Sequence, residues 1–139
     1  MSETTNTRRV YTVLVPWVPP VRLNPNQRTP ERTLRRLRNE GRDLAALAIR
    51  SAYPGKTAEP IAGPCRITYA VHWPEGRNRQ DGDNLKSSMK GVRDAFEREG
   101  LLVNDRLIVA DDVVQVFDGE GVTVVTLTET EGADARDHD

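Results

Sequence analysis

The chain has 139 residues, a length typical of one domain with a single core. Hydrophobic residues make up 37% and charged residues 29% of it, which excludes the disordered class but leaves only a modest core. One cysteine and two histidines exclude an intramolecular disulfide and a zinc site built from Cys and His. The N-terminus has no apolar signal segment, and prolines interrupt the longest uncharged stretch, so we expect a cytosolic protein without a membrane span.

The first half of the chain predicts a strand, a long loop and a helix. Residues 10–15 are rich in β-branched side chains and end at Pro16, which is typical of a strand. Prolines then mark 16–30 as an irregular loop. Leucines and alanines recur at three- and four-residue steps from residue 34, which predicts a helix that opens at Thr29 or Pro30 and ends before Pro54. Gly41 is a point where this helix could bend.

The second half predicts a strand, a helix and two further strands. Apolar and polar residues alternate over 65–73, the pattern of a strand. A polar loop follows, and a helix with one apolar face is expected from Asn84 to Gly100. Strands at 107–117 and 122–128 flank a Gly-rich segment that indicates a hairpin. The expected fold class is α+β, or mixed α/β, with a small sheet of about four strands covered by two helices in a single domain.

Charges of opposite sign are concentrated in different parts of the chain, although the net charge is only -1. On the first predicted helix, Arg32, Arg35 and Arg36 lie on the face opposite the leucines. Arginine suits bidentate phosphate contacts, so this face could meet an anion, and a merely solvated face is the alternative. Residues 129–139 are acidic without an apolar pattern, which predicts a disordered tail after a domain covering 1–128, whose first nine residues are expected to be flexible.

Two carboxylates, Asp81 and Asp83, stand two residues apart where the polar loop enters the second helix. Side chains at this spacing in an extended segment point the same way, so both could bind one Mg²⁺ together with water and a substrate phosphate. Asp105 precedes the next strand and is the natural third ligand if the returning chain meets the first two. Lys86 and Lys90 follow on the helix, about one and two turns beyond the aspartates, where an ammonium could stabilise charge on a phosphate.

Each of these residues also has a purely structural interpretation. Asp83 or Asn84 is a good N-cap residue, and Asp81 is an ordinary turn former. Asp105 could belong to a simple turn between helix and strand. A further acidic pair at 111–112 falls inside a strand pattern and is expected to face solvent.

Three segments, taken in order, resemble the signature of the RusA family of Holliday junction resolvases. They are Arg77–Leu85, Lys90–Phe96 and Gly100–Asp105, and the early segment Val15–Pro20 with the following Asn24 is similar to the family's first strand end. The resemblance covers residues 10–128 and is strongest from 77 to 105. It implies a small α/β homodimer of bacterial or phage origin that cleaves opposed strands of a four-way DNA junction with Mg²⁺, for which Mn²⁺ is a possible substitute.

Carried over by position, Asp81, Asp83 and Asp105 match the metal-binding and catalytic aspartates of that family. Lys90 matches its essential lysine only if three residues are inserted after Leu85, so Lys86 remains a candidate. An asparagine at position 104 replaces the aspartate that usually precedes the last metal ligand. This replacement removes one negative charge from the site.

DNA binding is expected from Arg77, Arg79, Lys86 and the arginine face of the first helix, through contacts to phosphates. Arg77 and Arg79 could instead only neutralise the neighbouring aspartates. Two other functions stay open: a non-catalytic protein that binds branched DNA, and a metal-dependent nuclease acting on other branched or single-stranded DNA.

Overall fold

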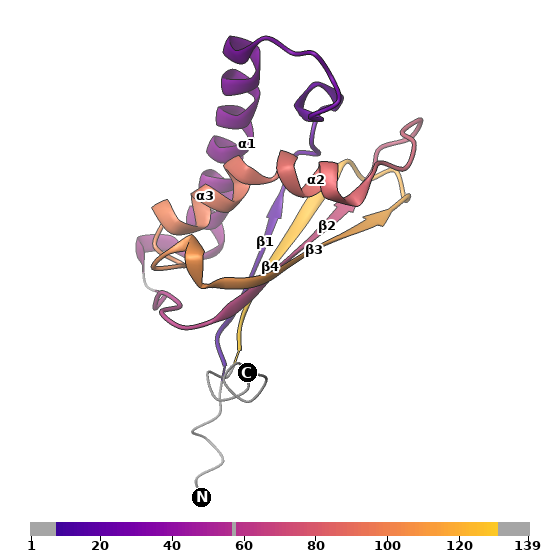
Figure 1. The fold of residues 1–139 in the computed structure, drawn as a ribbon. Helices are drawn as coiled ribbons and strands as arrows, with labels where there is room; N and C mark the ends of the chain where they lie inside the picture. Colours follow the sequence, from indigo (N-terminus) through magenta and orange to yellow (C-terminus); the bar gives the residue numbers. More distant parts are fainter. Residues whose placement is uncertain (1–7, 57, 131–139) are drawn as a thin grey trace, which may run out of the picture.

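A four-stranded mixed sheet with helices over one face forms the body of the protein (Figure 1). The computed structural model describes residues 8–56 and 58–130. The main elements are β1 (Val10–Val15), α1 (Glu31–Ala52), β2 (Cys65–His72), α2 (Gly82–Ser88), α3 (Lys90–Arg98), β3 (Ile108–Val116) and β4 (Val122–Glu129). Short 3₁₀ turns occur at η2 (Val21–Leu23), η3 (Pro54–Lys56) and η4 (Asp105–Leu107). The α+β class expected from the sequence is confirmed.

The strand order is β1-β4-β2-β3, which makes the expected hairpin of the last two strands wrong. β4 is antiparallel to both β1 and β2, and β3 pairs with β2 in parallel on the far side. The connection therefore crosses the end of β2, where the N–H of Gly119 donates to the carbonyl of Trp73 at 2.9 Å. Gly119 and Gly121 have positive φ and shape this wider turn. The central place of β4 buries Thr123, Val125 and Leu127 on the helix-covered face.

α1 is continuous through Gly41. Leu37, Gly41, Ala45 and Ile49, spaced four residues apart, form its buried side. A Cβ at Gly41 would lie 2.9 Å from Cζ2 of Trp17, so the absence of a side chain there lets the indole pack directly on the helix. The first proline-rich loop is thereby attached to α1.

The single helix expected over 84–100 is two helices, α2 and α3, separated at Met89. Met89 has φ -90° and ψ 3°, and its side chain is buried. The change of direction brings α3 against α1 at Gly91, where a Cβ would lie only 2.3 Å from the carbonyl oxygen of Arg38. The two backbones are therefore in direct contact.

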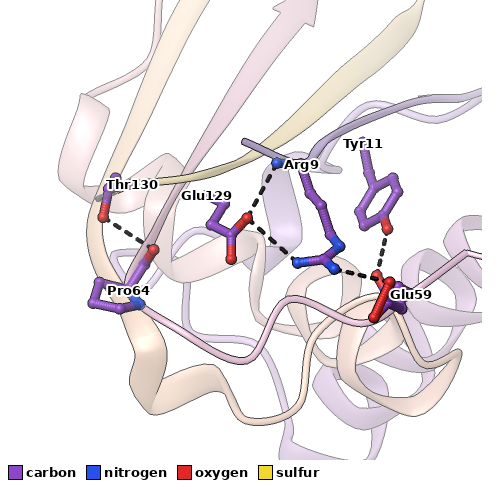
Figure 2. Close-up of polar contacts among 6 residues, drawn as sticks. All are labelled: Arg9, Tyr11, Glu59, Pro64, Glu129 and Thr130. Carbon is purple, nitrogen blue, oxygen red and sulfur yellow. Dashed lines mark hydrogen bonds and ion pairs between the residues drawn. The ribbon is translucent and has the colours of Figure 1, made fainter. Parts of the chain in front are cut away.

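Arg9, just before β1, and Thr130, just after β4, are both held by hydrogen bonds (Figure 2). The N–H of Glu129 donates to the carbonyl of Arg9, and the N–H of Arg9 donates to Oε1 of Glu129 at 3.2 Å. The Arg9 guanidinium also lies 2.9 Å from Oε1 of Glu59, and the hydroxyl of Thr130 donates to the carbonyl of Pro64 at 3.0 Å. Arg9, which was expected to be flexible, is therefore held by hydrogen bonds. Glu129, which was expected to begin a disordered tail, is the last residue of β4. Residues 1–7 and 131–139 lie outside the described residues.

The two faces of the sheet differ, and the acidic pair at 111–112 is divided between them. Asp112 is exposed as expected, but Asp111 faces the helices, half-buried, with Oδ2 at 3.9 Å from Nη1 of Arg93. The uncovered face carries exposed apolar side chains, including Leu14 and Val114. Among the described residues, no helix combines the length and apolarity needed to cross a bilayer.

Candidate functional site

Asp81 is the N-cap of α2. Its Oδ1 accepts hydrogen bonds from the N–H groups of Asp83 at 2.9 Å and Asn84 at 3.2 Å. The capping interpretation is thus confirmed, but for Asp81 rather than for Asp83 or Asn84. Asp83 lies in the first turn, where the helix dipole favours a negative charge. Both carboxylates are exposed, and with the described residues neither Asp81 Oδ2 nor the Asp83 carboxylate makes a hydrogen bond.

Gln115 on β3 fixes the loop that leads into these aspartates. Its Oε1 accepts from the N–H of Gln80 at 2.9 Å, and its Nε2 donates to the carbonyl of Gln80 at 2.8 Å. The indole N–H of Trp73 donates to the same Oε1 at 3.0 Å. These bonds hold the residue before Asp81 to the end of the sheet. The only sequence signal for Gln115 is an amide in an otherwise apolar half-strand, and our sequence analysis missed it.

The proline-rich loop contacts the same segment from the other side. Nδ2 of Asn24 lies 3.5 Å from Oε1 of Gln80, and Nη2 of Arg77 donates to the carbonyl of Pro19 at 3.3 Å. Residues 19–24 and 77–80, far apart in the chain, therefore meet beside the start of α2. The end of the early segment Val15–Pro20, together with Asn24, thus lies beside the loop that leads into the acidic motif.

Arg77 and Arg79 are held against aromatic rings. The guanidinium carbon of Arg77 is 4.4 Å from the ring centroid of Trp73, and that of Arg79 is 5.5 Å from the ring of Phe117. Within the described part of the chain, neither arginine is paired with Asp81. The alternative role for these arginines was to neutralise the aspartates. Their contacts do not show such ion pairs.

Asp105 lies far from the other two aspartates of the same chain. It begins η4, and its N–H donates to Oε1 of Glu97 near the end of α3, at 3.2 Å. β3 alone runs about 23 Å from Ile108 to Gln115, at 3.3 Å per residue; Gln115 is bonded to the loop before Asp81, whereas Asp105 precedes Ile108 (Figure 1). In the described ranges, no three His, Cys, Asp or Glu residues form a group that could hold a metal. The expectation that the returning chain meets Asp81 and Asp83 is therefore wrong for one protomer.

The two candidate lysines have different surroundings. Lys86 lies in the last turn of α2, one turn beyond Asp83, and is half-buried. Lys90 begins α3 after the break, so the expected two-turn alignment with Asp83 does not hold. Lys90 instead lines a hollow of about 120 Å³ between α3 and α1, together with Arg35 and Arg38.

The arginine face of α1 is exposed as expected. Arg32, Arg35 and Arg36 all reach solvent, and Arg36 has a weak ion pair with Glu40 at 3.8 Å. Because Arg35 borders the hollow that Lys90 lines, this face continues onto the start of α3. The positive surface therefore spans two elements.

The chain was compared with protein-family models and with curated proteins. No protein-family model matches the chain, and no curated protein matches it.

Proposed function

We propose that this protein is a Mg²⁺-dependent endonuclease that resolves four-way DNA junctions by paired, symmetric hydrolysis of opposed strands. One observation carries the proposal: Asp81 and Asp83 are exposed together at the end of a loop that is tied to the sheet and carries Arg77 and Arg79. Protein sites for Mg²⁺ in phosphoryl transfer use one or two carboxylates plus the substrate phosphate. The RusA-like order of the motifs supports the same activity, which would be carried out in the cytoplasm.

The donor set at the start of α2 fits a divalent cation. Capping uses Oδ1 of Asp81, which leaves Oδ2 and the carboxylate of Asp83 as oxygen donors on one surface. When bound there, Mg²⁺, or Mn²⁺ in its place, polarises the scissile phosphate and lowers the pKa of a bound water. The cap bonds hold the Asp81 carboxylate in one orientation, and the negative charge of the pair disfavours DNA until a cation neutralises it.

The cations around the carboxylates have separate tasks in this proposal. Lys86, three residues after Asp83 on the same helix, is a neighbour of that carboxylate and is the better-placed lysine to stabilise charge on the phosphate. Arg77 and Arg79 contact phosphates beside the cut. Lys90 and the arginine face of α1, Arg32, Arg35 and Arg36, bind a DNA arm further away, without reading sequence.

A homodimer would supply the third carboxylate. β3 is an edge strand, and Asp105 precedes its start while the Asp81 loop is bonded to Gln115 near its end. A two-fold axis through the free edge of β3 would bring the beginning of one strand beside the end of the other. Asp105 of the partner subunit would then approach Asp81 and Asp83, and the two sites would face two-fold-related DNA strands.

The defining experiment incubates the protein with an end-labelled four-way junction and a matched linear duplex, with Mg²⁺ or with a chelator. We expect symmetric nicks only in the junction and only with Mg²⁺. Asp83→Asn should abolish them, while Asp112→Asn, which removes an exposed carboxylate from the uncovered sheet face, should leave them unchanged. Cleavage of flaps or single strands instead would identify a different metal-dependent nuclease.

The non-catalytic alternative has a specific observation in its favour, because the cap bonds of Asp81 give that residue a structural role. A protein that only binds branched DNA would bind the junction with or without Mg²⁺ and give no product with any divalent cation. That result would reject the nuclease.

A further inference from the structure

A cavity of about 410 Å³ opens at the end of the sheet, beside the loop that carries the aspartates. Its walls include Trp73, Arg77, Phe117 and Asp118. The loop between β2 and α2 forms one side and projects beyond the strand ends (Figure 1). The hydrolysis proposed above uses none of the aromatic rings in this cavity.

Phe117 is the unusual member of the group. It follows the last residue of β3, and 49% of its surface is exposed, although Trp73 in the same wall is fully buried. An exposed phenyl ring at the rim of a cavity offers a flat apolar face to a ligand. Arg79 lies against this exposed ring at 5.5 Å, whereas Arg77 covers the buried ring of Trp73 at 4.4 Å.

The position of this group relative to the carboxylates is set by hydrogen bonds. Gln115 and Gln80 are joined by two hydrogen bonds. Phe117 lies two positions after Gln115, and Arg79 immediately precedes Gln80. Asp81 follows Gln80 directly. Phe117 and the aspartates are therefore held at the same end of the sheet.

The cavity lining combines two carboxylates, those of Glu75 and Asp118, with the guanidinium of Arg77. Asp118, its acidic wall residue on the β3 side, has Oδ2 at 2.7 Å from Nδ1 of His72, and the hydrogen bond with His72 lowers the pKa of Asp118. The Asp118 carboxylate is held toward His72, and Arg79 lies beside the cavity, against the Phe117 ring.

We infer that Phe117, together with the Arg79 guanidinium, stacks an unpaired base next to the scissile phosphate. This rests on the proposed function and extends it, because it explains how a branched substrate is distinguished from duplex. Bases inside a duplex are already stacked on both faces, whereas a base displaced at a branch point has a free face that aromatic and guanidinium planes can cover.

The test measures equilibrium binding of a fluorescent four-way junction, a short oligothymidylate and a blunt duplex, with Ca²⁺ in place of Mg²⁺ to limit hydrolysis. Phe117→Ala should weaken binding of the junction and of the oligothymidylate by roughly 5- to 100-fold, the effect of losing one stacked base. Duplex binding should change by less than about twofold, because it depends on phosphate contacts. Val114→Ala, which truncates a side chain of equal 49% exposure within β3, should change none of the three affinities.

A second variant tests stacking by a readout other than affinity. Phe117→Trp keeps a flat ring, so it should retain binding of the junction, and the introduced indole should be quenched by oligothymidylate but not by duplex. Circular dichroism checks that both variants fold. Unchanged binding of the junction and oligothymidylate by Phe117→Ala, or an indole that oligothymidylate does not quench, would overturn the inference while leaving the nuclease proposal standing. If the unaltered protein binds no DNA in any form, both proposals are rejected together.

Discussion

Asp81 has two roles, and substitution by alanine would remove both of them. Its Oδ1 caps α2, while its second oxygen is a proposed metal ligand. Asparagine is as good an N-cap as aspartate but lacks the charge that a hard cation needs. The cap and the ligand therefore respond differently to the two possible substitutions.

We expect Asp81→Asn to change the free energy of unfolding by no more than about a few tenths of a kcal/mol. Asp81→Ala should lower the free energy of unfolding by about 1 kcal/mol, because the N–H groups of Asp83 and Asn84 lose their acceptor. Both variants should lose junction cleavage. Urea unfolding and the junction assay measure the two effects, and full cleavage by Asp81→Asn would exclude this carboxylate as a ligand.

Cys65 provides a residue-scale test of the core. It is fully buried at the start of β2, and burial, with a smaller contribution from the negative charge of Glu129, raises the pKa of its thiol to about 11. Because the folded state favours the neutral thiol, burying Cys65 costs no ionisation energy below pH 9. Its contribution to the free energy of unfolding then falls as the pH rises from 9 toward 11.

Unfolding free energies measured at pH 8 and pH 10 should therefore differ, with a contribution from Cys65 of about 1 kcal/mol at the higher pH. Cys65→Ala should reduce the difference by about this amount. Native protein should also react with a thiol reagent far more slowly than unfolded protein. Rapid labelling of the native protein at neutral pH would show that the thiol is accessible.

At the scale of elements, the periodic patterns predicted most of the fold. The bounds of β1 agree with the expected 10–15, and those of α1, β2, β3 and β4 differ from the expected ones by one or two residues. Local patterns carry this information because each element buries one face at its own period. The break at Met89 escaped prediction because the apolar period continues through it, and only the contact of α3 with α1 requires the change of direction.

The contact between α1 and α3 can be tested at its two glycines. Gly91→Ala places a Cβ against a backbone carbonyl that cannot move without shifting α1, so we expect a loss of roughly 3 kcal/mol or more. Gly41→Ala meets the edge of the Trp17 ring, which can give way, and alanine is the better helix former, so its loss should be smaller. Gly63→Ala has no atom within 4 Å and serves as the control. Equal stability of all three in urea unfolding would contradict this packing.

At the scale of the whole molecule, one protomer leaves two sheet edges, β1 and β3, without partners among the described strands. It also separates Asp105 from Asp81 and Asp83 by the length of two helices. A site shared between two protomers would explain why a candidate ligand stands at the opposite end of an edge strand.

Mixing two inactive variants tests the shared site. Asp83→Asn and Asp105→Asn should each be inactive alone. If Asp105 of the partner subunit completes the site, a mixed dimer contains one intact site, so equal mixing after subunit exchange should restore about a quarter of the wild-type sites. Sites contained within one protomer would restore none. Sedimentation of the unaltered protein should show a dimer, and each variant should sediment in the same way.

The sequence by itself determined the four strands, the first helix, the α+β class and the neighbourhood of Asp81 and Asp83, because periodicity, capping and short spacing are local properties of the chain. Only the tertiary structure decided that β4 lies between β1 and β2, that Gln115 holds the acidic loop, and that Asp105 stands at the far end of β3. These depend on which strands bury the most surface together and on the path by which α2 and α3 return the chain. Contacts of that kind join residues far apart in sequence, and no local pattern records them.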